Sequence, residues 1–321
     1  MRKIAVLTSG GDAPGMNAAI RAVVRYAAKL DMEVYGVERG YEGLLTGNLT
    51  RMDSRSVSDT IHRGGTILKT ARCLEFVKPE GVAKAAEVLH AFGIEGLVVI
   101  GGDGSFRGMK DLLTLQNFPV VGIPGTIDND LAYTDYTLGF DTAVNTVIGA
   151  VNNIRDTMSS HDRACIIEVM GRHCGDIAVY AGLAGGCEEM LVPEIPYDID
   201  VLCGNIKRNM IKGKISTIIL LAEGVCPCTE LKKEIQSKID VTMRTVKLGY
   251  IQRGGTPSMA DRILAGRCGV RAVQLLKDDV VTGRVVGIRE NKIIDVDLIE
   301  ALDMPRKFDE ELYMIANSLT S

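Results

Sequence analysis

Two apolar runs that end in glycine and carboxylate clusters constrain the fold of this chain most. The run LVVI at 97–100 is followed by GGDGS at 101–105, after which apolar residues recur at helical spacing. The run VVGI at 120–123 is followed by PGTIDND at 124–130. The first pattern predicts a strand, a tight turn and a helix, and the second predicts a strand that ends in a polar loop. Because ligands favour the carboxyl edge of an open sheet, we expect both clusters to lie at such an edge.

The glycine cluster is suited to binding a polyphosphate. Three glycines within four residues let backbone N–H groups approach the phosphates closely, and the start of a helix adds partial positive charge. Asp103, inside the cluster, could then hold a magnesium ion. For an isolated GGDG, the alternative is a strand-to-helix corner whose glycines satisfy backbone geometry alone.

Asp128 and Asp130 form the second cluster, and two carboxylates separated by a single residue repel each other. Such a pair, with no evident helical or turn role, favours a bound cation or a general base. We expect the pair to be linked to a metal ion, with Asp128 accepting a proton from an acceptor hydroxyl.

These motifs resemble those of the bacterial ATP-dependent 6-phosphofructokinases, and the resemblance extends over essentially the whole chain. Further motifs follow in that family's order and approximate spacing: LTSGGDAPGMNAAIR from 7, RGGT from 63, SSHDR from 159, EVMGRHCGD from 168, AEGV from 222 and LGYIQRGGTP from 248. The resemblance implies an α/β fold of two Rossmann-like three-layer domains, each with a mostly parallel sheet. It also implies that the domains are discontinuous: 1–138 plus 251–301 for ATP, and 139–250 plus 302–321 for the sugar phosphate.

Periodicity predicts alternating strands and helices in both halves. Strands are predicted at 4–7, 33–37, 97–100, 120–123, 165–169, 190–192, 216–222, 242–248, 285–288 and 292–294. Besides the helix after GGDGS, helices are predicted at 16–30, 80–91, 140–158, 176–183, 198–211, 230–238, 258–276 and from 297 onward. Glycines at 36, 40, 43 and 47 predict that the segment after the second strand is interrupted.

Charge and cysteine content exclude several classes of protein. Lys and Arg total 37 against 41 acidic residues, a net charge of −4, so no overall basic field attracts nucleic acid. The first residues lack a signal-peptide core, and no apolar run approaches the length of a membrane span, so we expect a cytoplasmic location. Eight cysteines in a core-rich chain indicate buried thiols. The CPC sequence at 226–228 is weak evidence for zinc, and we interpret it as a loop.

The resemblance assigns roles to individual residues, with ATP, Mg²⁺ and fructose 6-phosphate as ligands. The catalytic set comprises Asp128 as the base with Thr126, Arg172, Arg72 and Gly11. The nucleotide set comprises Gly11, Arg72, Cys73, Gly102, Asp103, Gly104 and Ser105, with Asp103 as the metal ligand. The sugar-phosphate set comprises Thr126, Ile127, Asp128, Asp130, Arg163, Met170, Gly171, Arg172, Glu223, Arg244, Tyr250 and Arg253.

The resemblance further implies a homo-oligomer, most simply a homotetramer, because in that family Arg163 and Arg244 serve a neighbouring subunit's site. It implies a second anion site between subunits for ADP-like activators or phosphoenolpyruvate. The residues of that effector site are Arg21, Arg25, Asp59, Arg155, Gly186, Glu188, Lys212 and Lys214. The family's basic run reads Lys214-Ile215-Ser216 here, so we expect weakened effector binding. Tyr250 stands where the family usually has histidine, which removes a cationic group from the sugar-phosphate site.

Two other functions fit the same motifs. In the pyrophosphate-dependent branch of the family, aspartate and lysine occupy the positions of Gly104 and Gly125, so the two glycines favour ATP and are expected to leave room for the nucleotide. A catalytically silent nucleotide-binding regulator is expected to lose the base or the metal ligand, whereas Asp103, Asp128 and Asp130 are all present.

Overall fold

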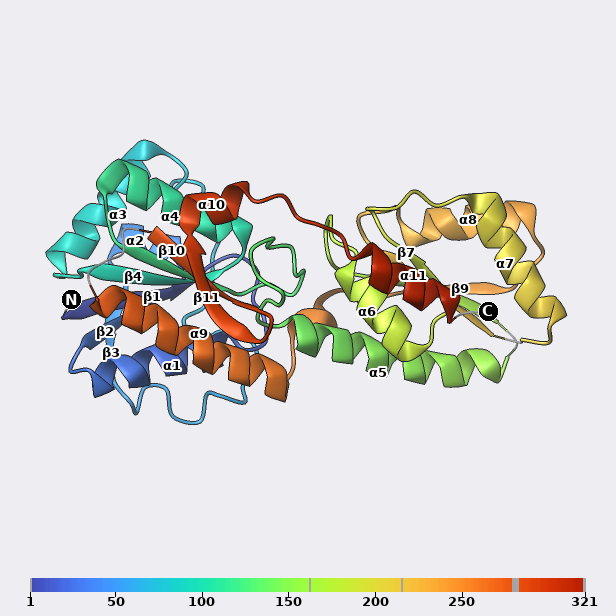
Figure 1. Ribbon diagram of the computed structural model, residues 1–321, viewed down its shortest axis with the longest axis horizontal. Coiled ribbons are helices and arrows are strands. Elements are labelled where there is room, and N and C mark those ends of the chain that lie inside the picture. Colours follow the sequence, from blue (N-terminus) through green and yellow to red (C-terminus); the bar gives the residue numbers. More distant parts are fainter. Residues whose placement is uncertain (1, 162, 215, 279–282, 320–321) are drawn as a thin grey trace. The chain divides into compact units, whose positions relative to one another are not determined.

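The computed structural model describes residues 2–161, 163–214, 216–278 and 283–319, and their contacts divide the chain into two compact units. The first unit comprises residues 1–142 and 253–306, and the second comprises 143–252 and 307–321. Each unit is an α/β layer structure, as predicted (Figure 1). The assignment of ATP to the first unit and sugar phosphate to the second stays a prediction.

A seven-stranded sheet forms the centre of the first unit, in the order β11-β10-β5-β4-β1-β2-β3. Its strands are β1 (Lys3–Thr8), β2 (Glu33–Val37), β3 (Leu49–Met52), β4 (Gly96–Gly101), β5 (Val120–Pro124), β10 (Gly283–Arg289) and β11 (Lys292–Asp297). The five inner strands are parallel, and only the two edge strands, β3 and β11, pair in the antiparallel direction. The carboxyl ends of β1, β4 and β5 therefore lie side by side.

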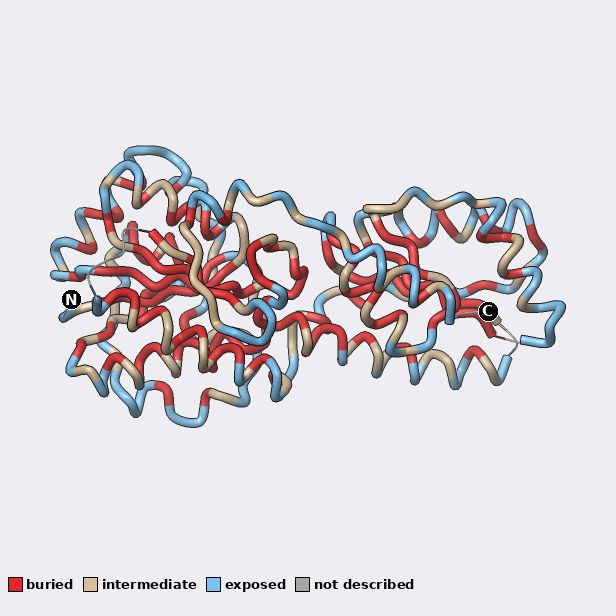
Figure 2. Tube along the Cα trace, viewed as in Figure 1, coloured by how far each residue is buried: buried red, intermediate tan, exposed pale blue. Residues whose placement is uncertain are grey.

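Helices cover both faces of this sheet (Figure 1). One face packs against α1 (Met16–Lys29) and α9 (Met259–Lys277), and Gly269 permits their close approach, since a Cβ there would lie 2.6 Å from the Ala22 methyl. The other face packs against α2 (Tyr41–Thr46), α3 (Pro79–Ala91), α4 (Asp103–Gln116) and α10 (Leu298–Asp303). The apolar strands are consequently buried on both faces (Figure 2).

The second unit has a four-stranded, fully parallel sheet in the order β7-β8-β6-β9. Its strands are β6 (Ala164–Val169), β7 (Glu189–Leu191), β8 (Thr217–Ala222) and β9 (Met243–Lys247). Its helices are α5 (Phe140–Ser159), which begins in the first unit, α6 (Asp176–Gly185), α7 (Ile199–Ile211), α8 (Cys228–Lys238) and α11 (Glu310–Ser318), with the short 3₁₀ helix η1 at Gly249–Arg253. Helices α7 and α8 bury one face of the sheet.

The predicted strands and helices are confirmed, except that the helix predicted from 297 onward is divided into α10 and α11 by the non-helical residues 304–309. Two other local predictions are wrong. The glycine-rich segment after β2 contains α2 and β3. Gly40 and Gly47 flank α2 with φ of 60° and 69°, and Gly43 lies where a Cβ would collide with the Glu38 carbonyl, so these glycines permit the helix rather than interrupt it. The CPC sequence is only partly a loop, because Cys228 is the first residue of α8 after Pro227.

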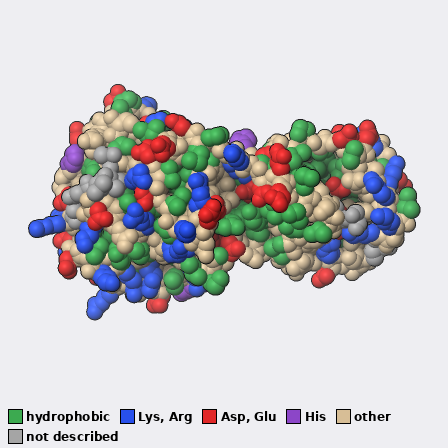
Figure 3. Space-filling view, in the orientation of Figure 1, with side chains coloured by type: hydrophobic (Ala, Val, Ile, Leu, Met, Phe, Trp, Pro, Cys, Tyr) green, Lys and Arg blue, Asp and Glu red, His purple; other side chains and the backbone are tan. Residues whose placement is uncertain are grey.

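Among the described residues, the structure contains no helix that is both long and apolar enough to cross a membrane. On the face of each unit seen in Figure 3, basic and acidic side chains are interspersed. This distribution agrees with the small net charge of the chain.

Candidate functional site

The glycine-rich loops of the first unit meet at the carboxyl ends of β1, β4 and β5. Gly10, with φ of 84°, approaches Ser105 so closely that a Cβ would lie 3.4 Å from the Ser105 hydroxyl. Gly102 faces Thr126, since a Cβ there would also lie 3.4 Å from the Thr126 side chain. The structure therefore brings together the predicted phosphate-binding loops and the start of the polar loop after β5.

The N-terminus of α4 opens toward these loops. Gly102 is the N-cap and supplies no side-chain acceptor, so the positive end of the 14-residue helix is not neutralised by a capping side chain. A Cβ on Gly104 would meet no heavy atom of the described chain within 4 Å. The Asp103 carboxylate pairs with Arg107 one turn later, at 2.8 Å, and stays 42% exposed.

Hydrogen bonds hold the polar loop after β5 in place. The Asp128 N–H donates to the Thr126 hydroxyl at 3.2 Å, and the Thr137 hydroxyl donates to the Thr126 carbonyl at 2.6 Å. Asn129 adopts a left-handed φ of 53°, and its side-chain oxygen accepts from the Thr137 N–H. These contacts keep the carboxylate of Asp128, only 5% exposed, at the end of β5.

Arg253 and the segment before Arg72 complete this part of the site. A Cβ on Gly11 would lie 2.9 Å from Nη1 of Arg253, so the absence of a side chain at Gly11 admits the guanidinium. The Thr70 hydroxyl donates to the Gly10 carbonyl at 2.7 Å, which places the chain leading to Arg72 and Cys73 near the first loop. Arg253 was predicted to bind the sugar phosphate, and the structure places it beside a predicted nucleotide residue.

Four of the predicted sugar-binding residues of the second unit lie together at the carboxyl edge of its sheet: Met170, Gly171, Arg172 and Glu223. The Arg172 N–H donates to a Glu223 carboxylate oxygen at 3.1 Å, and the Met170 N–H donates to the Gln252 side chain at 3.1 Å. Gly171 and Arg172 adopt positive φ values of 134° and 54°, which turn the chain sharply after β6. A cavity of about 390 Å³ opens here, lined by Glu168, Arg172, His173, Glu223, Gly224, Pro227 and Lys247.

Arg163 and Arg244 lie at the opposite edge of the same sheet. Arg163 precedes β6, and Arg244 pairs in register with Cys165 near the start of β6. The length of that strand, about 20 Å at roughly 3.3 Å per residue, separates them from Arg172. A single chain therefore does not bring these two arginines to the cavity. Tyr250 lies on η1 and is 80% exposed.

Four predicted effector residues lie together in the second unit. The buried carboxylate of Glu188 pairs with Arg155 at 3.2 Å and with Lys214 at 2.8 Å, and Arg155 also donates to the Gly186 carbonyl at 2.7 Å. Lys212 is the exposed C-cap of α7. Arg21, Arg25 and Asp59 belong to the first unit, and Ile215 lies outside the described residues.

The prediction about Gly125 needs correction. A Cβ at this position would lie 3.0 Å from Ile100 Cγ2, 3.1 Å from Met16 Cε and 3.3 Å from the Gly101 nitrogen. It would point into packed atoms, so Gly125 serves the close packing of β4 and β5 and does not itself provide open space for a nucleotide. Gly104 alone has the open surroundings that the prediction assumed for both.

Sequence patterns missed the ion pair between Glu168 and Lys247 at the cavity. A signal was present, because a glutamate inside the apolar strand CIIEV is a buried carboxylate that needs partners. Among the described residues, sequence patterns also missed a group of possible metal ligands, Cys174, Asp176 and Glu194, whose ligand atoms lie within 4.8 Å of one another.

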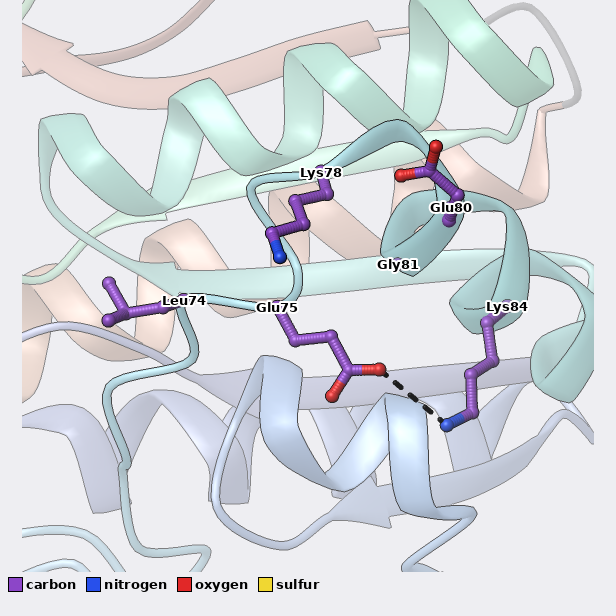
Figure 4. A pocket seen from close by; sticks show the side chains of 6 residues that line it. All are labelled: Leu74, Glu75, Lys78, Glu80, Gly81 and Lys84. Carbon is purple, nitrogen blue, oxygen red and sulfur yellow. Dashed lines mark ion pairs between the residues drawn. The ribbon is translucent and has the colours of Figure 1, made fainter.

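A second cavity, of about 490 Å³, follows Cys73 in the first unit. Figure 4 shows that lysine and glutamate side chains surround it, with Glu75 and Lys84 forming an ion pair at 3.8 Å. Among the described residues, its lining does not include the glycines of the phosphate-binding loops. We assign it no role in the site.

Comparisons with known proteins point to one family. The family model described as Phosphofructokinase matches residues 3–276. The chain is 58% identical to ATP-dependent 6-phosphofructokinase of Clostridium tetani, over the full length of both proteins, and 57% identical to ATP-dependent 6-phosphofructokinase 1 of Clostridium perfringens, over 99% of each. Among solved structures, phosphofructokinase from Saccharomyces cerevisiae superimposes with a TM-score of 0.88 and 36% identity, and the match covers 99% of this chain and 47% of the yeast chain.

Proposed function

The chain belongs to the phosphofructokinase family, and we propose that it transfers the γ-phosphoryl group of ATP to the 1-hydroxyl of fructose 6-phosphate. The products are ADP and fructose 1,6-bisphosphate, and the reaction is a step of glycolysis. The similarity to relatives named as ATP-dependent enzymes, at 57–58% identity over 99–100% of the chain, supports ATP rather than pyrophosphate as the donor.

The observation that carries the proposal is the position of Asp128. Its carboxylate is buried at the carboxyl end of β5. The Thr126 hydroxyl, which accepts a hydrogen bond from the Asp128 N–H, lies beside Gly102 at the N-terminus of α4. Phosphoryl transfer needs donors for the phosphates and a base near the acceptor hydroxyl, and this arrangement offers both within one loop cluster. Asp128 would accept the proton of the 1-hydroxyl as that oxygen attacks the γ-phosphorus.

The donor would bind with its phosphates at Gly11 and at the start of α4. The free N–H groups of a helix N-terminus and its dipole favour an anion there, and the space above Gly104 is open. Asp103 offers an oxygen donor of the kind that Mg²⁺ prefers and would help to hold the ion, which would neutralise charge on the phosphates. Arg107, which pairs with Asp103 in this structure, would have to release it.

The sugar phosphate would bind to Met170, Gly171, Arg172 and Glu223. The Glu223 carboxylate, already bonded to the Arg172 N–H, can accept from sugar hydroxyls, and the Arg172 guanidinium can draw charge from the transferred group. Because Arg163 and Arg244 lie at the far edge of their sheet, we propose that they act in a neighbouring subunit of a homotetramer. The enzyme would be cytoplasmic, and Arg155, Glu188 and Lys214 would belong to an effector site for ADP or phosphoenolpyruvate.

A coupled spectrophotometric assay with purified protein tests the proposal. Fructose 1,6-bisphosphate formation is measured with ATP and Mg²⁺, with pyrophosphate and Mg²⁺, and with ATP plus excess chelator. We expect activity in the first assay only. Comparable kcat/KM with pyrophosphate, or no activity with ATP on any of several sugar phosphates, would contradict the proposal.

A further inference from the structure

The cavity of the second unit contains an ion pair to which the proposed reaction assigns no role. Glu168 of β6 and Lys247 of β9 are register partners at the carboxyl ends of adjacent parallel strands, and Lys247 Nζ lies 2.5 Å from Glu168 Oε1. Both side chains line the cavity that contains Arg172 and Glu223. The pair is therefore part of the same surface as the proposed sugar-binding residues.

The Glu168 carboxylate is fixed from two sides. It is 5% exposed, and its second oxygen accepts from the N–H of Cys228, the first residue of α8, at 3.2 Å. A carboxylate at a helix N-terminus is stabilised by the helix dipole. Burial acts to raise the pKa of Glu168, but hydrogen bonds from Lys247 and Cys228 outweigh it, and the net pKa is lowered. The Glu168 carboxylate is thus held by Cys228 on one side and by Lys247 on the other.

Lys247 differs from its partner because its side chain is 65% exposed. The hydrogen bond with Glu168 raises the pKa of Lys247, which keeps the ammonium group charged. An ammonium group has three N–H donors, and the contact with Glu168 occupies only one side of it. Lys247 lines the same cavity as Arg172.

A purely structural pair would serve only to neutralise a buried carboxylate. For comparison, the second unit contains an ion pair between Lys238 and Asp200, whose charged atoms lie 2.7 Å apart. In that pair the carboxylate is not buried, because the Asp200 side chain is 76% exposed. Lys238 has no place in the lining of the cavity that Lys247 shares with Arg172 and Glu223. The lining contains two cationic side chains, Arg172 and Lys247, and two carboxylates, Glu168 and Glu223. Both carboxylates already accept backbone N–H groups, from Cys228 and Arg172, so the N–H donors of the two cationic side chains can bind an anionic ligand at this sheet edge.

We propose that Lys247 is a substrate-binding residue that holds the phosphate of the sugar substrate in this cavity, and that Glu168 is a positioning residue that directs its ammonium group there. The inference rests on the proposed function, because it takes fructose 6-phosphate as the ligand. Lys247 would thus supply a cationic group for the sugar phosphate, whereas Tyr250 carries none.

The test is calorimetric titration of fructose 6-phosphate into the full-length protein, together with steady-state kinetics. For Lys247→Met, we expect the Kd and KM for fructose 6-phosphate to rise about 10-fold or more, the size of a lost charged hydrogen bond. The KM for ATP and the kcat should change much less. Lys247→Arg should restore most of the affinity, and the control Lys238→Met should match the wild type.

Lys247→Met leaves the buried charge of Glu168 without its partner, which can impair folding. The double variant Glu168→Gln, Lys247→Met removes that charge and should show the same loss of affinity. Wild-type Kd in either folded variant, even with a lowered Tm, would overturn the proposal and leave the pair a structural one. Failure of the wild type to bind fructose 6-phosphate would instead overturn the proposed function itself.

Discussion

Replacing Gly104 and Gly125 separately by alanine tests how the first unit admits a nucleotide. Gly104 is the second residue of α4, and a methyl group there would enter open space. An alanine in a helix should stabilise the fold by about 0.4–1 kcal/mol because it restricts the unfolded chain. If ATP phosphates lie against the start of α4, the same methyl crowds them. A cost of about 1–3 kcal/mol corresponds to a rise of about 5- to 150-fold in the KM for ATP.

Gly125→Ala should have the opposite effect on stability. The added methyl meets Ile100, the end of Met16 and the backbone nitrogen of Gly101 at 3.0–3.3 Å, and only the methionine end can move easily. Overpacking of this kind costs about 1–3 kcal/mol. For a unit of this size, the Tm should fall by about 2–4 °C per kcal/mol.

Differential scanning fluorimetry and initial rates at varied ATP concentration measure both effects. Gly266→Ala in α9 is the matched control, because a Cβ there also meets no heavy atom of the described chain within 4 Å. It should raise the Tm as Gly104→Ala does and leave the KM for ATP unchanged. The reasoning is refuted if Gly104→Ala raises the Tm without changing the KM for ATP, or if Gly125→Ala is as stable as the wild type.

Three further predictions concern single side chains, and a fourth concerns effectors. Asp128→Asn should lower kcat by about 10²–10⁴-fold, the usual contribution of a general base, with little change in substrate affinity. If stopped or coupled assays find wild-type turnover in the folded variant, Asp128 is not the general base. If the Tyr250 phenol binds the sugar phosphate, Tyr250→Phe should raise the KM for fructose 6-phosphate more than it lowers kcat. An unchanged KM would show that cationic residues bind the sugar phosphate without Tyr250. Asp261→Ala should lower the free energy of unfolding, measured in urea, by about 3 kcal/mol or more. The variant leaves the buried N–H groups of Gly139 and Thr142, which lie 2.8 and 2.9 Å from the carboxylate, without an acceptor. A loss below about 1 kcal/mol would contradict this expectation. Phosphoenolpyruvate and ADP should change the rate only weakly at subsaturating fructose 6-phosphate, since an effector shifts a conformational equilibrium only by its differential affinity for the two states. Strong inhibition at micromolar phosphoenolpyruvate would show that other residues replace the missing basic groups.

Local patterns predicted most of the elements because each depends on a few neighbouring residues. The run LVVI followed by GGDGS becomes β4 and α4 since apolar residues of this kind favour a buried strand and the glycines permit the tight turn. The same reasoning failed between β2 and β3, where Gly43 is required by a contact with the Glu38 carbonyl that periodicity does not reveal.

The sequence by itself therefore determined the alternation of strands and helices, the glycine loops at strand ends and, through its motifs, the family. Only the tertiary structure decided which strand ends are neighbours, because strand order depends on the packing of whole faces. It placed Arg253 against Gly11, some 240 positions earlier in the chain. It placed Arg163 and Arg244 at the edge opposite Arg172. It also paired Glu168 with Lys247, since parallel register sets two distant residues side by side with no trace in local spacing.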